Sequence, residues 1–161
     1  MKISKNITYK EATVSNTAKL YSIENVPNEF QLANMKMVAE KCFQPLRDWY
    51  GKPIGVSSFF RSEELNKKLG SSKTSQHLQG LYSENEEGAI DIDADVFDNG
   101  ITNKAIFEWL KVNVEFDQLI WEYGSEVEPA WVHVSFRKGA NRKMLLNARK
   151  NSKNKTYYTI R

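Results

Sequence analysis

Apolar residues recur at steps of three and four between positions 28 and 50, the spacing that gathers side chains on one face of an α-helix. Asn28 is a suitable N-cap for this helix, and Gly51 and Pro53 end the pattern. The apolar stripe consists of Leu32, Met35, Ala39, Cys42, Phe43, Leu46 and Trp49. The pattern therefore predicts one long amphipathic helix over residues 28–50.

Four short segments have the composition of β-strands, and the clearest is AIDIDA, in which apolar and acidic side chains alternate. Serine, glycine and asparagine at 71–88 predict a polar loop before that strand, and Gly124 and Pro129 predict a loop between the last two strands. The four expected strands are 54–60, 89–94, 117–123 and 131–136.

Two further helices are predicted among these strands. Ser62 can cap a brief helix that ends at Gly70, and Thr102 can cap a longer one. Because helices and strands do not alternate regularly, we expect an α+β fold with a mainly antiparallel sheet and flanking helices. No repeat, low-complexity tract or linker divides the sequence, so we expect a single domain over residues 1–161.

The composition is that of an ordinary globular protein, with 40% apolar and 27% charged residues. A mean hydropathy of −0.59 and the absence of any long apolar run predict no membrane insertion. No apolar signal segment follows Met1, so we expect cytoplasmic synthesis without a signal peptide. The single cysteine, Cys42, excludes a disulfide within one chain, and we expect a monomer.

The net charge of +3 conceals an uneven distribution, because residues 137–161 contain nine Lys and Arg and no acidic residue. Such a basic segment is able to bind nucleic acid or an anionic cell-wall glycopolymer. The alternative is a solvated last element, in which KTYYTI forms a strand at the edge of the sheet. We favour the edge strand and expect no nucleic-acid partner.

Only two histidines occur in the chain, and neither lies where a core histidine would be usual. His77 lies in the polar loop SKTSQHLQG, His133 in the aromatic-rich strand WVHVSF, and Asp91 in the strand AIDIDA. Two imidazoles and one carboxylate are a common ligand set for a catalytic zinc ion. The spacing is not that of HExxH, in which both histidines lie on one helix. These three residues are therefore candidate metal ligands brought together by the fold.

Four motifs in order, SFFRSEELN, SKTSQH, GAIDID and WVHVSF, resemble the zinc D-Ala-D-Ala carboxypeptidase and L-alanyl-D-glutamate endopeptidase family. Members are peptidoglycan peptidases of bacteria and of bacteriophage endolysins, and the helix at 28–50 is similar to the phage type. The resemblance implies a hedgehog/DD-peptidase-like fold, with the motifs in a core at 28–136 and a basic segment at 137–161. It also implies one Zn²⁺ per chain, held by His77, Asp91 and His133.

Two departures from the family pattern affect the site. His77 and Asp91 are fourteen residues apart instead of seven, which identifies LYSENEE at 81–87 as an insertion beside the cleft. Many relatives place the catalytic base where this chain has Ala130, which cannot transfer a proton. Phage-type relatives place an acid in the preceding strand, where Glu122 matches. Glu128 is the other candidate, and we favour Glu122 because a strand fixes a side chain better than a loop.

The resemblance also assigns substrate-binding roles. Arg61 would bind a substrate carboxylate through two hydrogen bonds, and Ser75 would orient the substrate or the ligand loop. The expected enzyme is a zinc metallopeptidase that hydrolyses D-Ala-containing or L-Ala-D-Glu bonds of the stem peptide with a metal-activated water. A phage endolysin of this kind would act at the cell wall after release. The alternative is a non-catalytic protein of the same fold that binds cell-wall peptide or belongs to the virion.

Overall fold

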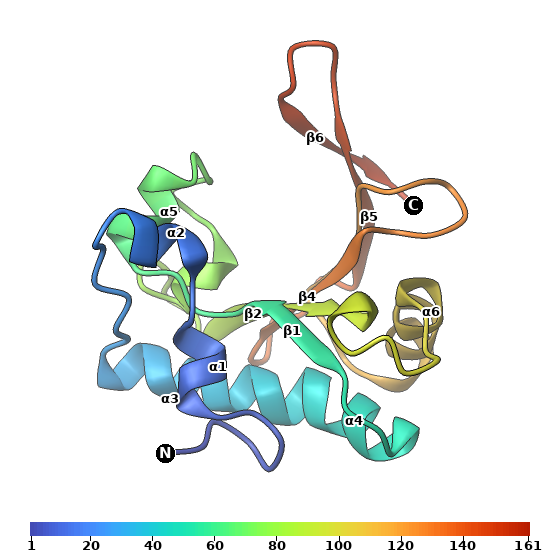
Figure 1. Cartoon of the computed structure of the whole chain (residues 1–161), viewed down its shortest axis with the longest axis horizontal. Coiled ribbons are helices and arrows are strands. Elements are labelled where there is room, and N and C mark those ends of the chain that lie inside the picture. Colours follow the sequence, from blue (N-terminus) through green and yellow to red (C-terminus); the bar gives the residue numbers. More distant parts are fainter.

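A six-stranded sheet forms the centre of the protein, for which a computed structural model describes residues 1–161 (Figure 1). The strand order is β1-β2-β4-β3-β5-β6, and every neighbouring pair is antiparallel except β3 and β5. This confirms the α+β fold with a mainly antiparallel sheet. The strands are β1 (Gly55–Ser58), β2 (Glu87–Asp93), β3 (Gln118–Glu122), β4 (Trp131–Arg137), β5 (Met144–Lys150) and β6 (Thr156–Ile160).

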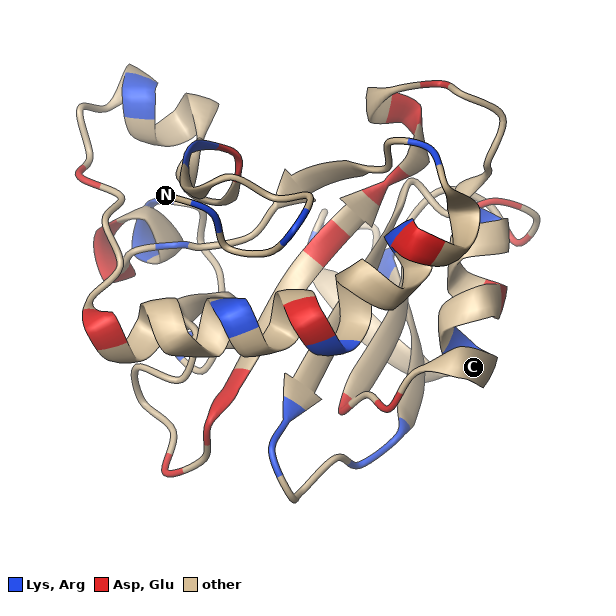
Figure 2. Ribbon diagram, turned by 90° about the horizontal axis from the view of Figure 1, so that it is seen from below, with Lys and Arg blue, Asp and Glu red and all other residues tan.

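The long predicted helix is confirmed as three consecutive segments, α3 (Glu29–Val38), the π-helical turn η1 (Ala39–Phe43) and α4 (Gln44–Tyr50). Asn28 and the side chain of Gln31 form a reciprocal capping box at its start. Gly51 ends it with a φ of 75°, which favours glycine. The helix lies across one face of the sheet, and its outer side carries charged residues of both signs (Figure 2).

Alternation along the strands divides the sheet into an apolar face and a face that carries the candidate ligands. The apolar face packs against α3, α4 and α6 (Asn103–Asn113), where the ring of Phe107 meets Trp121 edge to face at 5.4 Å. Burial of this face supplies the main driving force for folding. The core residues from β2, β4 and β3 are Ile90, Ile92, Leu119, Trp121, Val132, Val134 and Phe136.

Short helices complete the fold. The brief helix predicted after Ser62 is α5, which the Ser62 hydroxyl caps by accepting from the Leu65 N–H. The loop predicted at 71–88 contains one helical turn, and β2 begins two residues earlier than expected. None of the helices has the length and apolar content that a bilayer crossing requires. The short helices are α1 (Tyr9–Thr13), α2 (Asn16–Leu20), α5 (Glu63–Lys68), η2 (Gln76–Leu78) and η3 (Ala94–Val96).

The basic end of the chain forms a hairpin of β5 and β6, residues 144–160, which we call the C-terminal hairpin. The expected edge strand at KTYYTI is confirmed as β6, while β5 was not expected from the sequence. β5 joins the sheet by parallel pairing with β3, and the hairpin then rises from the sheet on the side away from α3 and α4 (Figure 1).

Candidate metal centre

Three elements bring the two histidines and one aspartate together. Asp91 of β2 and His133 of β4 are directly paired across the sheet, so their side chains share one face. His77 reaches the same point from η2. The Asp91 Oδ1 atom lies 2.9 Å from His133 Nδ1 and 3.1 Å from His77 Nε2. All three side chains are buried, and their ligand atoms form a group that could hold a metal ion.

Burial and mutual attraction determine the charges of this group. Burial alone would raise the pKa of Asp91, but its interactions with His77 and His133 hold that pKa well below its usual value. Burial is also the main cause that lowers the pKa of His77. At neutral pH Asp91 is therefore ionised and His77 is neutral, which are the protonation states of metal ligands.

The second nitrogen of His77 shows that the donor set fits zinc. Nδ1 lies 2.8 Å from the carbonyl oxygen of Phe59, and because a carbonyl only accepts, Nδ1 carries the proton. The lone pair of Nε2 then faces the ionised Oδ1 atom of Asp91, an arrangement that a cation between them would stabilise. Ligand atoms around a tetrahedral zinc ion are about 3.4 Å apart, and the ligand atoms of these three residues all lie within 4.8 Å of one another.

Glu122 ends β3 on the same face of the sheet. Ile120 pairs with His133, so Glu122 lies one step further along that face, and both acid and imidazole line a cavity of about 1380 Å³. The Glu122 side chain is only 7% exposed and makes no ion pair. Burial raises the pKa of its carboxyl from 4.5 to about 7. A carboxyl that titrates near neutrality is suited to take and return a proton.

The other candidate base has a different position. Glu128 does not line the cavity, and its carboxylate accepts a hydrogen bond of 3.0 Å from the backbone N–H of Lys104 in the first turn of α6. A carboxylate at a helix N-terminus is a stabilising feature of the helix. Ala130, at the position of the base in many relatives, lies in the turn that follows β3, where its N–H donates to the Glu122 carbonyl.

Arg61 and Ser75 both line the cavity and both contact the ligand group. The Arg61 guanidinium donates to Asp91 Oδ2 at 3.3 Å, which leaves Oδ1 directed toward the histidines. It also donates to the Ser58 hydroxyl at 3.1 Å. The Ser75 hydroxyl accepts from the His77 N–H at 3.3 Å, so in this structure it holds the loop that carries His77.

A buried network beside the site was not identified from the sequence. Gln76, which precedes His77, donates to the carboxylate of Asp117 at 2.9 Å. The same carboxylate receives two hydrogen bonds from the guanidinium of Arg142, at 2.8 and 2.7 Å. These residues are 25 and 41 positions apart, so no local spacing signals the contact. The network fastens the His77 loop to the start of β3.

The inserted segment at 81–87 forms part of the cavity rim. Leu81, Tyr82 and Ser83 line the cavity, and Glu87 begins β2 and pairs with Arg137 at 2.6 Å. The expectation that this segment borders the cleft agrees with its position, although its last residue belongs to a strand.

Comparison with known proteins gives a family. The family model described as Peptidase M15 matches residues 5–135, which include His77, Asp91, Glu122 and His133. No curated protein sequence matches the chain. The matched region covers most of the chain and contains both histidines and Asp91, so the chain belongs to the Peptidase M15 family of zinc metallopeptidases.

Proposed function

We propose that the protein is a zinc-dependent peptidoglycan peptidase that hydrolyses a D-Ala-containing or an L-Ala-D-Glu bond of the stem peptide. The observation that carries the proposal is the placement of a His-Asp-His group and a separate buried carboxyl on one face of the sheet, in one cavity. We extend it to residues 1–161 as one metallopeptidase domain, because β5 and β6 continue the sheet that carries the site.

Each site residue has a role in this proposal. His77, Asp91 and His133 would hold the zinc ion, which would lower the pKa of a bound water and polarise the peptide carbonyl. Glu122 takes a proton from the water that attacks the carbonyl carbon. As the C–N bond breaks, Glu122 returns that proton to the amine nitrogen. Arg61 binds a substrate carboxylate, and Ser75 keeps the His77 loop in place.

Hydrolysis of purified peptidoglycan and of synthetic stem peptides tests the reaction. We expect the wild type to release one new amino terminus, which mass spectrometry assigns to one of the two bonds. Glu122→Gln, which keeps the shape of the side chain but cannot accept a proton, should lose at least about a hundredfold in kcat while still binding zinc. Glu128→Gln is the matched control and should retain activity, because Glu128 lies outside the cavity.

Metal analysis tests the ligand set separately. We expect about one zinc ion per chain in the wild type, and its loss in His133→Ala. A protein that keeps zinc and binds stem peptide but cleaves neither bond would be a non-catalytic member of the family. A Glu122→Gln variant as active as the wild type would exclude Glu122 as the base.

The resemblance to phage-type members supports a role as an endolysin that acts at the cell wall. Purified protein added to cell walls should then lower their turbidity, and Glu122→Gln should not.

A further inference from the structure

The cavity beside the candidate ligands has a second wall that the C-terminal hairpin supplies. Arg61 and the loops around His77 line one side, and Lys150, Lys155 and Tyr158 line the other. The hairpin follows residue 135, the last residue that the family model matches. This wall therefore belongs to a part of the chain for which the family comparison gives no role.

Strand register places the hairpin on the same face as the candidate base. Glu122 pairs with Ala148 of β5, and Ala148 pairs with Tyr158 of β6, so the three side chains form one row across the sheet. Ala148 is fully buried and does not line the cavity, whereas Glu122 and Tyr158 on either side of it do. Adjacent strands are about 4.8 Å apart, so the row spans about 10 Å, the reach of two or three residues of a peptide.

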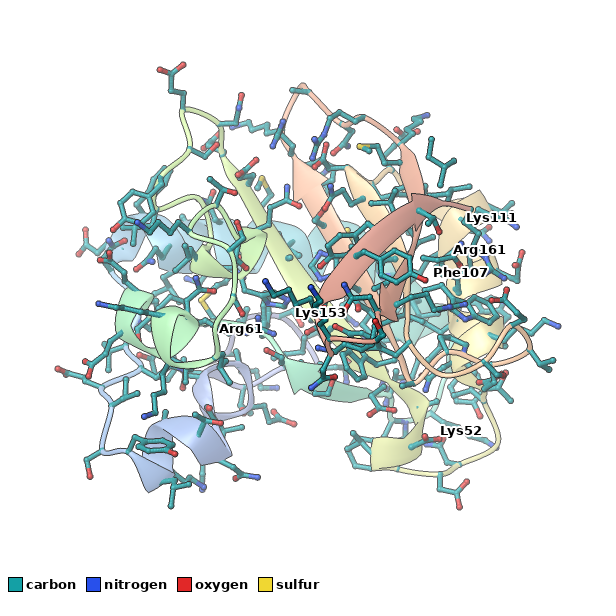
Figure 3. All side chains as sticks on the ribbon, turned by 90° about the horizontal axis from the view of Figure 1, so that it is seen from above. Lys52, Arg61, Phe107, Lys111, Lys153 and Arg161 are labelled. Carbon is teal, nitrogen blue, oxygen red and sulfur yellow. The ribbon has the colours of Figure 1, made fainter.

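Lys150 lies two residues beyond Ala148 on the same face of β5. Its Nζ atom lies 5.4 Å from the ring centroid of Tyr123, beside Glu122. Lys155 lines the cavity from the turn before β6. Lys153 lies at the tip of the hairpin and does not line the cavity. Figure 3 labels Lys153 and Arg61 and views the protein from the side on which the hairpin stands.

The charges that line the cavity favour an anionic ligand. Among the residues that line the cavity, six are lysines or arginines and three are aspartates or glutamates. Three of the basic side chains are arginines that already pair with acidic partners, Asp91, Glu87 and Asp117. The other three are lysines that make no ion pair, and two of them belong to the hairpin. The basic residues are Arg61, Lys73, Arg137, Arg142, Lys150 and Lys155, and the acidic ones are Glu87, Asp91 and Glu122.

We propose that Lys150 and Lys155 bind a carboxylate of the substrate peptide at a distance from the bond that is cleaved, so that the enzyme selects acidic peptides. The inference rests on the proposed function and adds a specificity determinant to it. A peptide is the ligand favoured here because both ammonium groups line the cavity that contains the His-Asp-His group and Glu122. A positive cleft also concentrates anionic substrate and speeds its binding.

Steady-state kinetics on a matched pair of peptides tests this. The first is a stem peptide with the α-carboxylate of its D-glutamate free, and the second is the same peptide with that carboxylate amidated. For the zinc-loaded full chain, Lys150→Gln/Lys155→Gln should raise KM for the acidic peptide about three- to tenfold, with little change in kcat. KM for the amidated peptide should not change, so the preference of the wild type disappears.

Lys104→Gln/Lys153→Gln is the control, because both lysines are exposed and neither lines the cavity. This double substitution removes the same total charge as Lys150→Gln/Lys155→Gln. It should keep the wild-type KM for both peptides. An equal rise of KM for both peptides in Lys150→Gln/Lys155→Gln, or the same rise in the control, would overturn the proposal.

Calorimetric binding of the same peptides to Glu122→Gln separates this proposal from the proposed function. If the wild type cleaves neither peptide, the proposed function fails, and the dissociation constants still decide whether the two lysines distinguish the acidic peptide. Tight, salt-sensitive binding of a single-stranded oligonucleotide that depends on the two lysines, with no peptide binding, would assign the hairpin to nucleic acid and overturn the inference.

Discussion

Glu122 and Asp91 are two carboxyl groups on one face of the sheet whose pKa values are shifted in opposite directions. Burial raises the pKa of Glu122 to about 7, since no cationic side chain pairs with it. Asp91 is also buried, but its interactions with His77 and His133 hold its pKa low. These opposite shifts suit Asp91 to remain an anion and Glu122 to exchange a proton, which are the roles proposed for them.

The raised pKa of Glu122 predicts a pH-dependent gain of stability for Glu122→Gln in the metal-free protein. Between pH 4.5 and about 7 the unfolded chain has lost this proton and the folded chain keeps it, so wild-type stability falls as pH rises through that range. At pH 8 the glutamine variant should be more stable by up to about 3 kcal/mol, and at pH 4 the two should be equal. Urea unfolding with a chelator present measures both values.

Glu40→Gln provides the control for this measurement, because Glu40 is exposed in the long helix and its carboxyl stays solvated when the protein folds. A Glu122→Gln effect of the same size at pH 4 and pH 8 would show that the carboxyl is not desolvated in the folded protein.

Among the elements, those with a strong apolar period could be predicted, and those fixed by distant partners could not. The helix at 28–50 and the strand at AIDIDA each have an apolar spacing that identifies the element from its own residues. β5 does not, because arginine, lysine and asparagine interrupt MLLNARK, and its parallel pairing with β3 supplies the missing stabilisation. The π turn was also missed, because one helical turn of different pitch leaves the apolar spacing almost unchanged.

The network around Asp117 predicts that Arg142→Met destabilises the protein. Asp117 is fully buried, and its carboxylate loses two hydrogen bonds and its countercharge in this variant. The cost at pH 7 should be about 2–3 kcal/mol, since a buried charge is left partly unpaired. Arg142 holds down the pKa of Asp117, so the cost should shrink as pH falls and the carboxyl becomes protonated.

Lys143→Met is the neighbouring control for Arg142→Met. Its ion pair with Glu115 joins two side chains that are both more than 60% exposed, so the change in unfolding free energy should stay below about 0.5 kcal/mol. Equal effects of the two substitutions in urea would mean that the Asp117 network contributes nothing particular to stability.

For the whole molecule, the family motifs predicted the residues that meet at the centre of the cavity but not what surrounds them. The motifs identified His77, Asp91 and His133 as candidate ligands, and the fold brings both histidines within hydrogen-bonding distance of Asp91. The hairpin wall lies beyond the motifs, and the hydrogen bond from His77 to Phe59 involves a backbone oxygen that any residue would provide. Such contacts depend on tertiary structure, which spacing along the chain does not encode.

Zinc should stabilise the whole fold, because its candidate ligands come from η2, β2 and β4, which meet only in the folded protein. Ligand that binds the folded state alone at a hundred times its Kd adds about 2.7 kcal/mol. For a domain of this size that corresponds to a rise in Tm of about 5–10 °C. Calorimetry should show this rise for the wild type and for Glu122→Gln, which keeps all three ligands, and should show none for His133→Ala. An equal rise in His133→Ala would mean that zinc binds elsewhere on the protein, and the ligand set proposed here would then be wrong.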